Sequence, residues 1–86
     1  MKLVLSAHKV TLTSALKTHV RQCIEKLDHQ ETHALKAFVN LERDHTGVSD
    51  KKFTCTMKVS LPGQNLVARD SESDLYAAID LVTKKI

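Results

Sequence analysis

The chain has 86 residues, a hydrophobic fraction of 42% and a charged fraction of 27%, the balance expected of one small globular domain. Its net charge of +3 permits an anionic partner without requiring one. The apolar run over residues 3–5 is far too short for a signal peptide or a membrane span, so we expect a cytoplasmic protein that binds no membrane. Cys23 and Cys55 are therefore expected to be free thiols.

The first third of the chain predicts a strand followed by a helix. Residues 2–7 alternate with the period of two that is typical of a strand with one apolar face. Apolar residues then recur at helical spacing, which predicts a helix over residues 14–28 that Thr11 or Thr13 can cap. The polar stretch at 28–33 is expected to end this helix.

The middle of the chain predicts an antiparallel arrangement of three strands. Alternation over residues 35–42, and more clearly over residues 53–61, indicates half-buried strands separated by a loop at 44–50. Pro62 and Gly63 suit a tight turn into a fourth strand, because proline fixes one central φ and glycine supplies a positive one. The residues expected on the inward side of the second strand are Leu35, Ala37, Val39 and Leu41.

A second helix follows the fourth strand. Ser71 stands three residues before Asp74, a spacing that resembles a capping box. An apolar stripe at helical spacing then begins at Leu75 and is still running at Ile86. We therefore expect the chain to lack the C-terminal end of this helix and any tail beyond it.

Together these elements predict one α+β domain over residues 1–86, in the order β-α-β-β-β-α. The first helix is a crossover, so strands one and two should be parallel, and the last three strands should form an antiparallel meander. The result is a four-stranded mixed sheet with two helices packed on one face, which resembles the core of the double-stranded RNA-binding domain. The residues expected to face solvent on the other side of the sheet are Lys36, Asn40, Thr54, Thr56, Lys58 and Arg69.

The pattern of histidines and cysteines does not predict a catalytic or metal site. His29 and His33 are four residues apart but fall in a probable linker, without the spacing of a zinc motif. His19 and Cys23 are one helical turn apart, so a thiolate–imidazole pair is conceivable. Cys23, however, borders the apolar stripe, where a free cysteine usually behaves as a small hydrophobe. We expect no enzyme, no metal or cofactor and no small-molecule substrate.

Basic residues flank the apolar stripes of both predicted helices. Lys17 and Arg21 lie on one flank of the first helix and Lys26 on the other, while Lys84 and Lys85 close the second helix. The simplest interpretation is the solvated face of two amphipathic helices. The alternative is that the two helices lie side by side and pool these charges into one surface for RNA phosphates, which needs no aromatic stacking platform.

The chain resembles the ribosome hibernation-promoting factors. This family includes the ribosome-associated inhibitor protein Y and has also been labelled sigma-factor modulation proteins. Residues 74–80, Asp-Leu-Tyr-Ala-Ala-Ile-Asp, look like the start of the second helix of that family. Residues 3–5, 10–16, 26–27 and 66–68 match its spacing, so the resemblance covers essentially the whole chain.

The resemblance implies a translation inhibitor and hibernation factor that binds the small ribosomal subunit. Binding would take place in the mRNA and tRNA channel, chiefly through rRNA, during stress or stationary phase. Cys23 departs from the family, whose members often carry Lys or Arg there. By position, the residues implied for rRNA binding are Lys17, Lys26 and Lys85, with Arg21 and Lys84 as additional basic residues, and Tyr76, for which packing against the sheet edge is an equal alternative.

Three other functions compete with this interpretation. The first is a double-stranded RNA-binding module that acts off the ribosome, although Asp74 and Asp80 stand where such a domain carries basic residues. The second is a protein-interaction module that acts on a transcription factor. The third is an enzyme built on Cys23 and His19.

Overall fold

The computed structural model describes residues 2–30, 33–43 and 52–86. The predicted order of elements is confirmed, and the predicted loop at 44–50 lies outside the described residues. The elements are β1 (Lys2–His8), α1 (Ser14–Gln30), β2 (Lys36–Arg43), β3 (Phe53–Leu61), β4 (Gln64–Glu72) and α2 (Leu75–Lys85).

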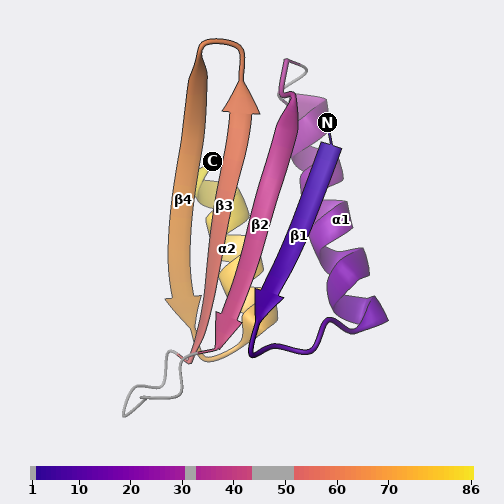
Figure 1. The fold of residues 1–86 in the computed structure, drawn as a ribbon, viewed down its shortest axis with the longest axis vertical. Coiled ribbons are helices and arrows are strands. Elements are labelled where there is room, and N and C mark those ends of the chain that lie inside the picture. The colour runs from indigo at the N-terminus through magenta and orange to yellow at the C-terminus, as the bar shows by residue number, and fades with distance from the viewer. Residues whose placement is uncertain (1, 31–32, 44–51) are drawn as a thin grey trace.

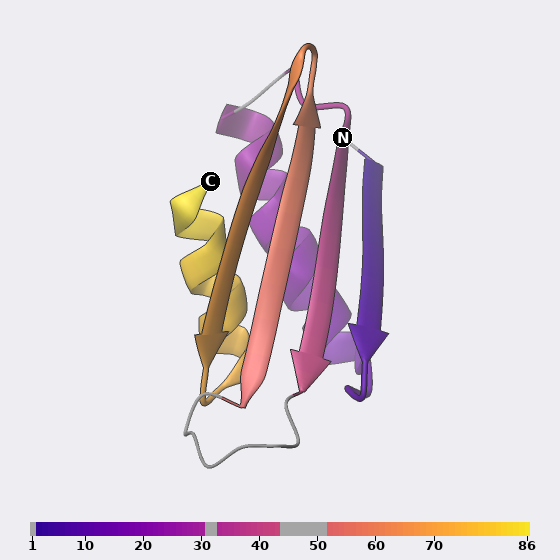
Figure 2. The same cartoon turned by 60° about the vertical axis from the view of Figure 1, so that its left-hand side comes forward.

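The four strands form one sheet in the order β1-β2-β3-β4. As predicted, β1 runs parallel to β2, and the pairs β2–β3 and β3–β4 are antiparallel. Both helices lie on the same face of the sheet, α1 behind β1 and β2 and α2 behind β3 and β4 (Figures 1 and 2). The α+β class and the two-layer architecture are therefore confirmed.

The core is centred on the paired inward residues of β2 and β3. Cross-strand neighbours stack in three successive rows, each buried to 2% exposure or less. These rows pair Ala37 with Val59, Val39 with Met57, and Leu41 with Cys55. Each large apolar side chain that is buried in this way contributes about 1.5–3 kcal/mol relative to an exposed one.

One apolar stripe of each helix closes this core. The stripes have the spacing of an amphipathic helix, so a single face of each helix packs on the sheet. The buried residues are Leu16, Val20, Cys23, Ile24 and Leu27 on α1, and Leu75, Ala78, Ile79 and Val82 on α2. With only three aromatic residues in the chain, the core is aliphatic as expected.

The two helices begin at side-chain caps. Thr13, one of the two predicted caps, accepts a hydrogen bond from the backbone N–H of Leu16 at 3.2 Å. The predicted capping box of Ser71 is wrong, because Ser71 belongs to β4 and its hydroxyl pairs with that of Thr54 at 2.8 Å. Asp74 caps α2 instead, and its carboxylate accepts a hydrogen bond from the N–H of Tyr76 at 3.3 Å.

Three boundaries or faces differ from the predictions. The first helix extends to Gln30, two residues beyond its predicted end. Leu35 precedes β2 and is 63% exposed, whereas Ala34 is buried in its place. Thr54 was expected to face solvent but is buried, and its hydroxyl forms a hydrogen bond with the hydroxyl of Ser71 on β4.

The predicted tight turn between β3 and β4 is confirmed. Leu61 pairs with Gln64, which leaves Pro62 and Gly63 as the two turn residues. Gly63 has a φ of 83°, a conformation that costs little only for glycine.

We predict that Val39→Asp unfolds the domain. Val39 is 1% exposed, and an unpaired carboxylate placed there costs several kcal/mol, a large part of the 5–15 kcal/mol or so that holds a domain together. The matched control is Val67→Asp, because Val67 is 65% exposed and pairs with Lys58 in the sheet. Circular dichroism melts measure both variants, and a cooperative melt of Val39→Asp near the wild-type temperature would contradict the buried register of β2.

Candidate functional site

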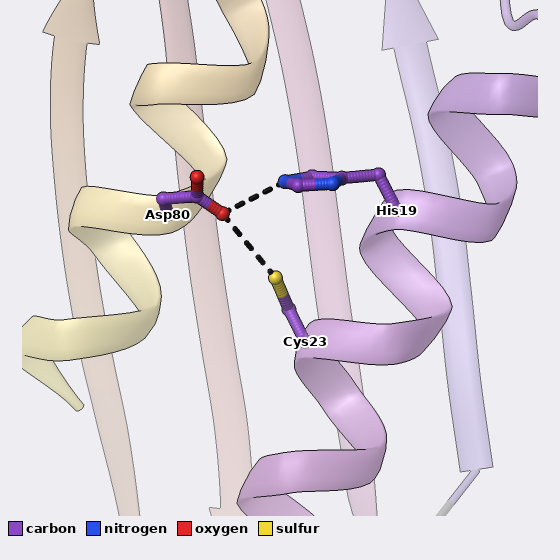
Figure 3. Close-up of side chains that lie close together, drawn as sticks. All are labelled: His19, Cys23 and Asp80. Carbon is purple, nitrogen blue, oxygen red and sulfur yellow. Dashed lines mark hydrogen bonds and ion pairs between the residues drawn. The ribbon is translucent and has the colours of Figure 1, made fainter.

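One flank of α1 meets one flank of α2 across the helical layer. His19 and Cys23 lie one turn apart on α1, and Tyr76 and Asp80 lie one turn apart on α2. His19 Nε2 is 2.7 Å from Asp80 Oδ1, and the Cys23 thiol donates to the same oxygen at 3.6 Å (Figure 3). The rings of His19 and Tyr76 pack edge to face, with centroids 5.0 Å apart.

An open groove of about 700 Å³ runs along this seam between the helices. Lys26 of α1 and Lys84 of α2 both line it, together with Gln30 and Thr83. The structure therefore brings together two of the predicted basic residues, one from each helix, as the hypothesis of a shared basic surface requires.

Lys85 points in another direction. Its Nζ lies 3.5 Å from Asp70 Oδ2 and donates a hydrogen bond to the carbonyl of Arg69 at 3.2 Å. Lys85 thus ties the end of α2 to β4, and the Asp70 carboxylate balances part of its positive charge. Its side chain is still 51% exposed, so it remains accessible to a partner.

Lys17 and Arg21 lie on the other flank of α1. Each is two residues from His19, which places it about 160° around the helix from the seam, at 100° per residue. Both side chains are exposed. The predicted basic residues are therefore spread across the helical layer, from the outer side of α1, through the groove, to the edge over β4.

Tyr76 is 36% exposed. Its aromatic contact is with His19 of the neighbouring helix, so the ring helps to set how α1 and α2 lie against each other. The rest of the ring remains open to solvent.

Sequence analysis missed Asp80 as a partner of His19 and Cys23. The spacing of His19 and Cys23 was visible, because both lie on one helix. Asp80 is 61 residues away from His19 in the chain, and only the side-by-side packing of the two helices brings it within hydrogen-bond distance. Its spacing of one turn from Tyr76 on the flank of α2 was the one signal available.

The environment of Cys23 is that of a protonated thiol. Burial raises the pKa of Cys23, and the neighbouring carboxylate of Asp80 adds to this shift. A nucleophilic cysteine needs the opposite change, a pKa lowered by a cation or an imidazolium. The shared Asp80 oxygen also lies between His19 and Cys23, so the imidazole is paired with the carboxylate instead of the thiol.

No helix of the described residues is long and apolar enough to span a bilayer.

Comparison with known proteins gives a consistent result across sequence and structure. The family model described as sigma 54 modulation protein / S30EA ribosomal protein matches residues 3–86. The ribosome hibernation promotion factor of Picosynechococcus is 30% identical over an alignment of 87 positions, which covers 100% of this chain and 45% of the relative. That of Bacillus subtilis is 33% identical over 79 residues, 90% of this chain and 40% of the relative. The chain thus spans about half the length of these curated relatives.

The fold is also similar to a solved structure. The N-terminal domain of protein Y from Thermus thermophilus superposes with a TM-score of 0.82 at 28% identity. The superposition covers 99% of this chain and 90% of that domain.

We predict that Cys55 is inert in the folded protein. It is fully buried, and burial raises its pKa to about 12, so about one thiol in ten thousand is ionised at pH 8. Cys23→Ala leaves Cys55 as the single thiol of the chain, and N-ethylmaleimide should then label it in urea but not in native buffer. Mass spectrometry counts the adducts, and equal labelling rates in the two conditions would contradict the placement of Cys55 in the core.

Proposed function

Because the chain belongs to the sigma 54 modulation protein / S30EA ribosomal protein family, we propose that it is a ribosome-associated translation inhibitor and hibernation factor. It binds the small ribosomal subunit in the mRNA and tRNA channel, chiefly through rRNA, during stress or stationary phase, and it acts in the cytoplasm. The single observation that carries this proposal is the family match over residues 3–86. The names of the curated relatives, ribosome hibernation promotion factors, support the same function.

The helical layer has the features that a phosphate-binding surface needs. All five predicted basic residues on it are exposed, so each can contact a phosphate and release condensed counterions. They are spread over both helices instead of being gathered in one pocket, which suits a folded RNA recognised by its shape and backbone. These residues are Lys17, Arg21, Lys26, Lys84 and Lys85.

Tyr76 takes a supporting part in this proposal. Packing against His19 holds its ring at the start of α2, while the exposed part of the ring can contact rRNA. Among the described residues it is the one aromatic side chain exposed on the helical face, so a platform that stacks successive bases is not formed there.

Two observations weigh against the alternatives. Asp74 and Asp80 place negative charge on the N-terminal half of α2, where a free double-stranded RNA binder needs cations. The raised pKa of Cys23 opposes an enzyme with a cysteine nucleophile. We therefore propose a binding protein without catalytic activity.

We predict that the chain pellets with the small ribosomal subunit in a salt-sensitive manner. Replacing Lys17, Lys26 and Lys85 together by Glu should abolish pelleting at moderate salt, because three phosphate contacts become three repulsions. Where residual binding can be measured, the slope of log K against log salt should fall by about three. Co-sedimentation with purified subunits across a salt series measures both quantities.

A matched control carries the same change in charge on the opposite face. Lys2, Lys36 and Lys58 lie on the open side of the sheet, so replacing them by Glu should leave pelleting much closer to wild type. A second variant combines Lys17→Glu, Lys26→Glu and Lys84→Glu. It keeps the Lys85–Asp70 ion pair, so a loss of pelleting in this variant cannot come from breaking that pair. Equal losses in the helical and sheet variants would remove the helical residues from the site, and no pelleting of the wild type at low salt would refute the ribosome proposal.

A further inference from the structure

We propose that His19, Cys23 and Asp80 form a binding site for a divalent transition metal ion, with zinc the ion that their chemistry suits best. The site lies on the seam between α1 and α2, and a bound ion would join the two helices (Figure 3). It is independent of the proposed ribosome binding, since it concerns the free protein.

Two of the three pairs of ligand atoms already lie close to the distances of a tetrahedral site, and the third pair, His19 with Cys23, has to come to about 3.5 Å. One nitrogen, one sulfur and one carboxylate oxygen all lie within 4.8 Å of one another. Bonds of about 2.0–2.3 Å in a tetrahedral zinc site separate ligand atoms by about 3.3–3.6 Å. The Cys23–Asp80 separation of 3.6 Å meets this value, and the His19–Asp80 separation of 2.7 Å has to widen by about half an ångström. Rotation of the half-exposed Asp80 side chain can supply that change.

The two helices hold these ligands from a packed scaffold. His19 and Cys23 are one turn apart on α1, the spacing that brings two ligands to the same side of a helix. Their neighbours Val20 and Ile24 are buried, as is Ile79 beside Asp80, so the backbone positions of all three ligands are fixed by the core. The site therefore requires little ordering of the chain when an ion binds.

The donor set favours zinc over the hard cations. Thiolate and imidazole are poor ligands for magnesium and calcium, which prefer oxygen, whereas zinc accepts sulfur, nitrogen and oxygen together. With three protein ligands, water from the adjoining groove takes the fourth position. His19 binds through Nε2, the nitrogen that now donates to the Asp80 carboxylate, so the proton of the neutral imidazole moves from Nε2 to Nδ1 when the ion binds.

Binding changes the charge of the seam in a defined way. The ion replaces the thiol proton of Cys23, which passes to the solvent, so zinc adds two positive charges and the new thiolate adds one negative charge. The site gains a net charge of about +1, which offsets the Asp80 carboxylate beside Lys26 and Lys84.

Cobalt(II) serves as the spectroscopic probe of the site, because it occupies zinc sites and a thiolate ligand gives it a charge-transfer band in the near ultraviolet. The wild-type chain should bind one cobalt ion with this band, and zinc should displace it. Cys23→Ala, His19→Gln and Asp80→Asn should each weaken cobalt binding tenfold or more, and Cys23→Ala should also remove the band. Zinc should raise the melting temperature of the wild type but not of these variants.

The matched controls are Cys55→Ala and His29→Gln, which remove the other thiol and another histidine of α1. Both should keep the band, the affinity and the thermal shift, with folding of every variant checked by circular dichroism. Absence of the thiolate band in the wild type, or its persistence in Cys23→Ala, would overturn the proposal. Loss of binding in His29→Gln alone would do the same, by placing the ion elsewhere. Ribosome pelleting is measured separately, so failure here leaves that result unaffected.

Discussion

The packing of two amphipathic helices on a single aliphatic face of the sheet is the constraint on which the rest of the structure depends. The inward residues of β2 and β3 are buried almost completely, and the stripes of α1 and α2 have no other surface to cover. Because both helices must occupy the same face, they lie side by side, and one flank of each is brought against the other (Figure 2). The seam between the helices is thus a consequence of the core.

The contacts across that seam, made by side chains of both helices, are mainly polar. His19 forms a hydrogen bond with the Asp80 carboxylate and packs edge to face with the Tyr76 ring, so one imidazole contacts two successive turns of α2. Asp80 in turn accepts a hydrogen bond from the Cys23 thiol. These contacts are modest in energy, since Asp80 is half exposed, and they add to the apolar packing that sets the relative position of the helices. The basic residues of the layer depend on that position, because the distance between Lys26 and Lys84 is set by it.

Much of the fold could be predicted from the sequence, because periodicity reports which face of an element is buried. The strand order, the parallel pairing of β1 with β2 and the Pro62–Gly63 turn all follow from local patterns. The errors arise where a residue depends on something remote in the chain. The hydroxyl of buried Thr54 forms a hydrogen bond with that of Ser71 on the neighbouring strand. Asp80 reaches His19 only because the two helices pack side by side. Such pairings have no period in the sequence, so periodicity cannot find them.

The net charge of the chain does not by itself indicate which face would bind RNA, because both faces carry cations. The open side of the sheet also carries cations, Lys36 and Lys58 among them, and Lys36 lies over the ring of Phe38 at 4.5 Å. On the helical side the cations lie on both helices, and Lys26 and Lys84 line the groove between them, an arrangement that would suit the phosphates of a folded RNA. In the proposed function, the contribution of this fold would be the spacing of charges, which is set by the helix seam, and the seam is set by the core. Under the proposed function, a substitution at His19 or Asp80 would accordingly act on rRNA binding through the relative position of the two helices, with every Lys and Arg of the helical layer kept.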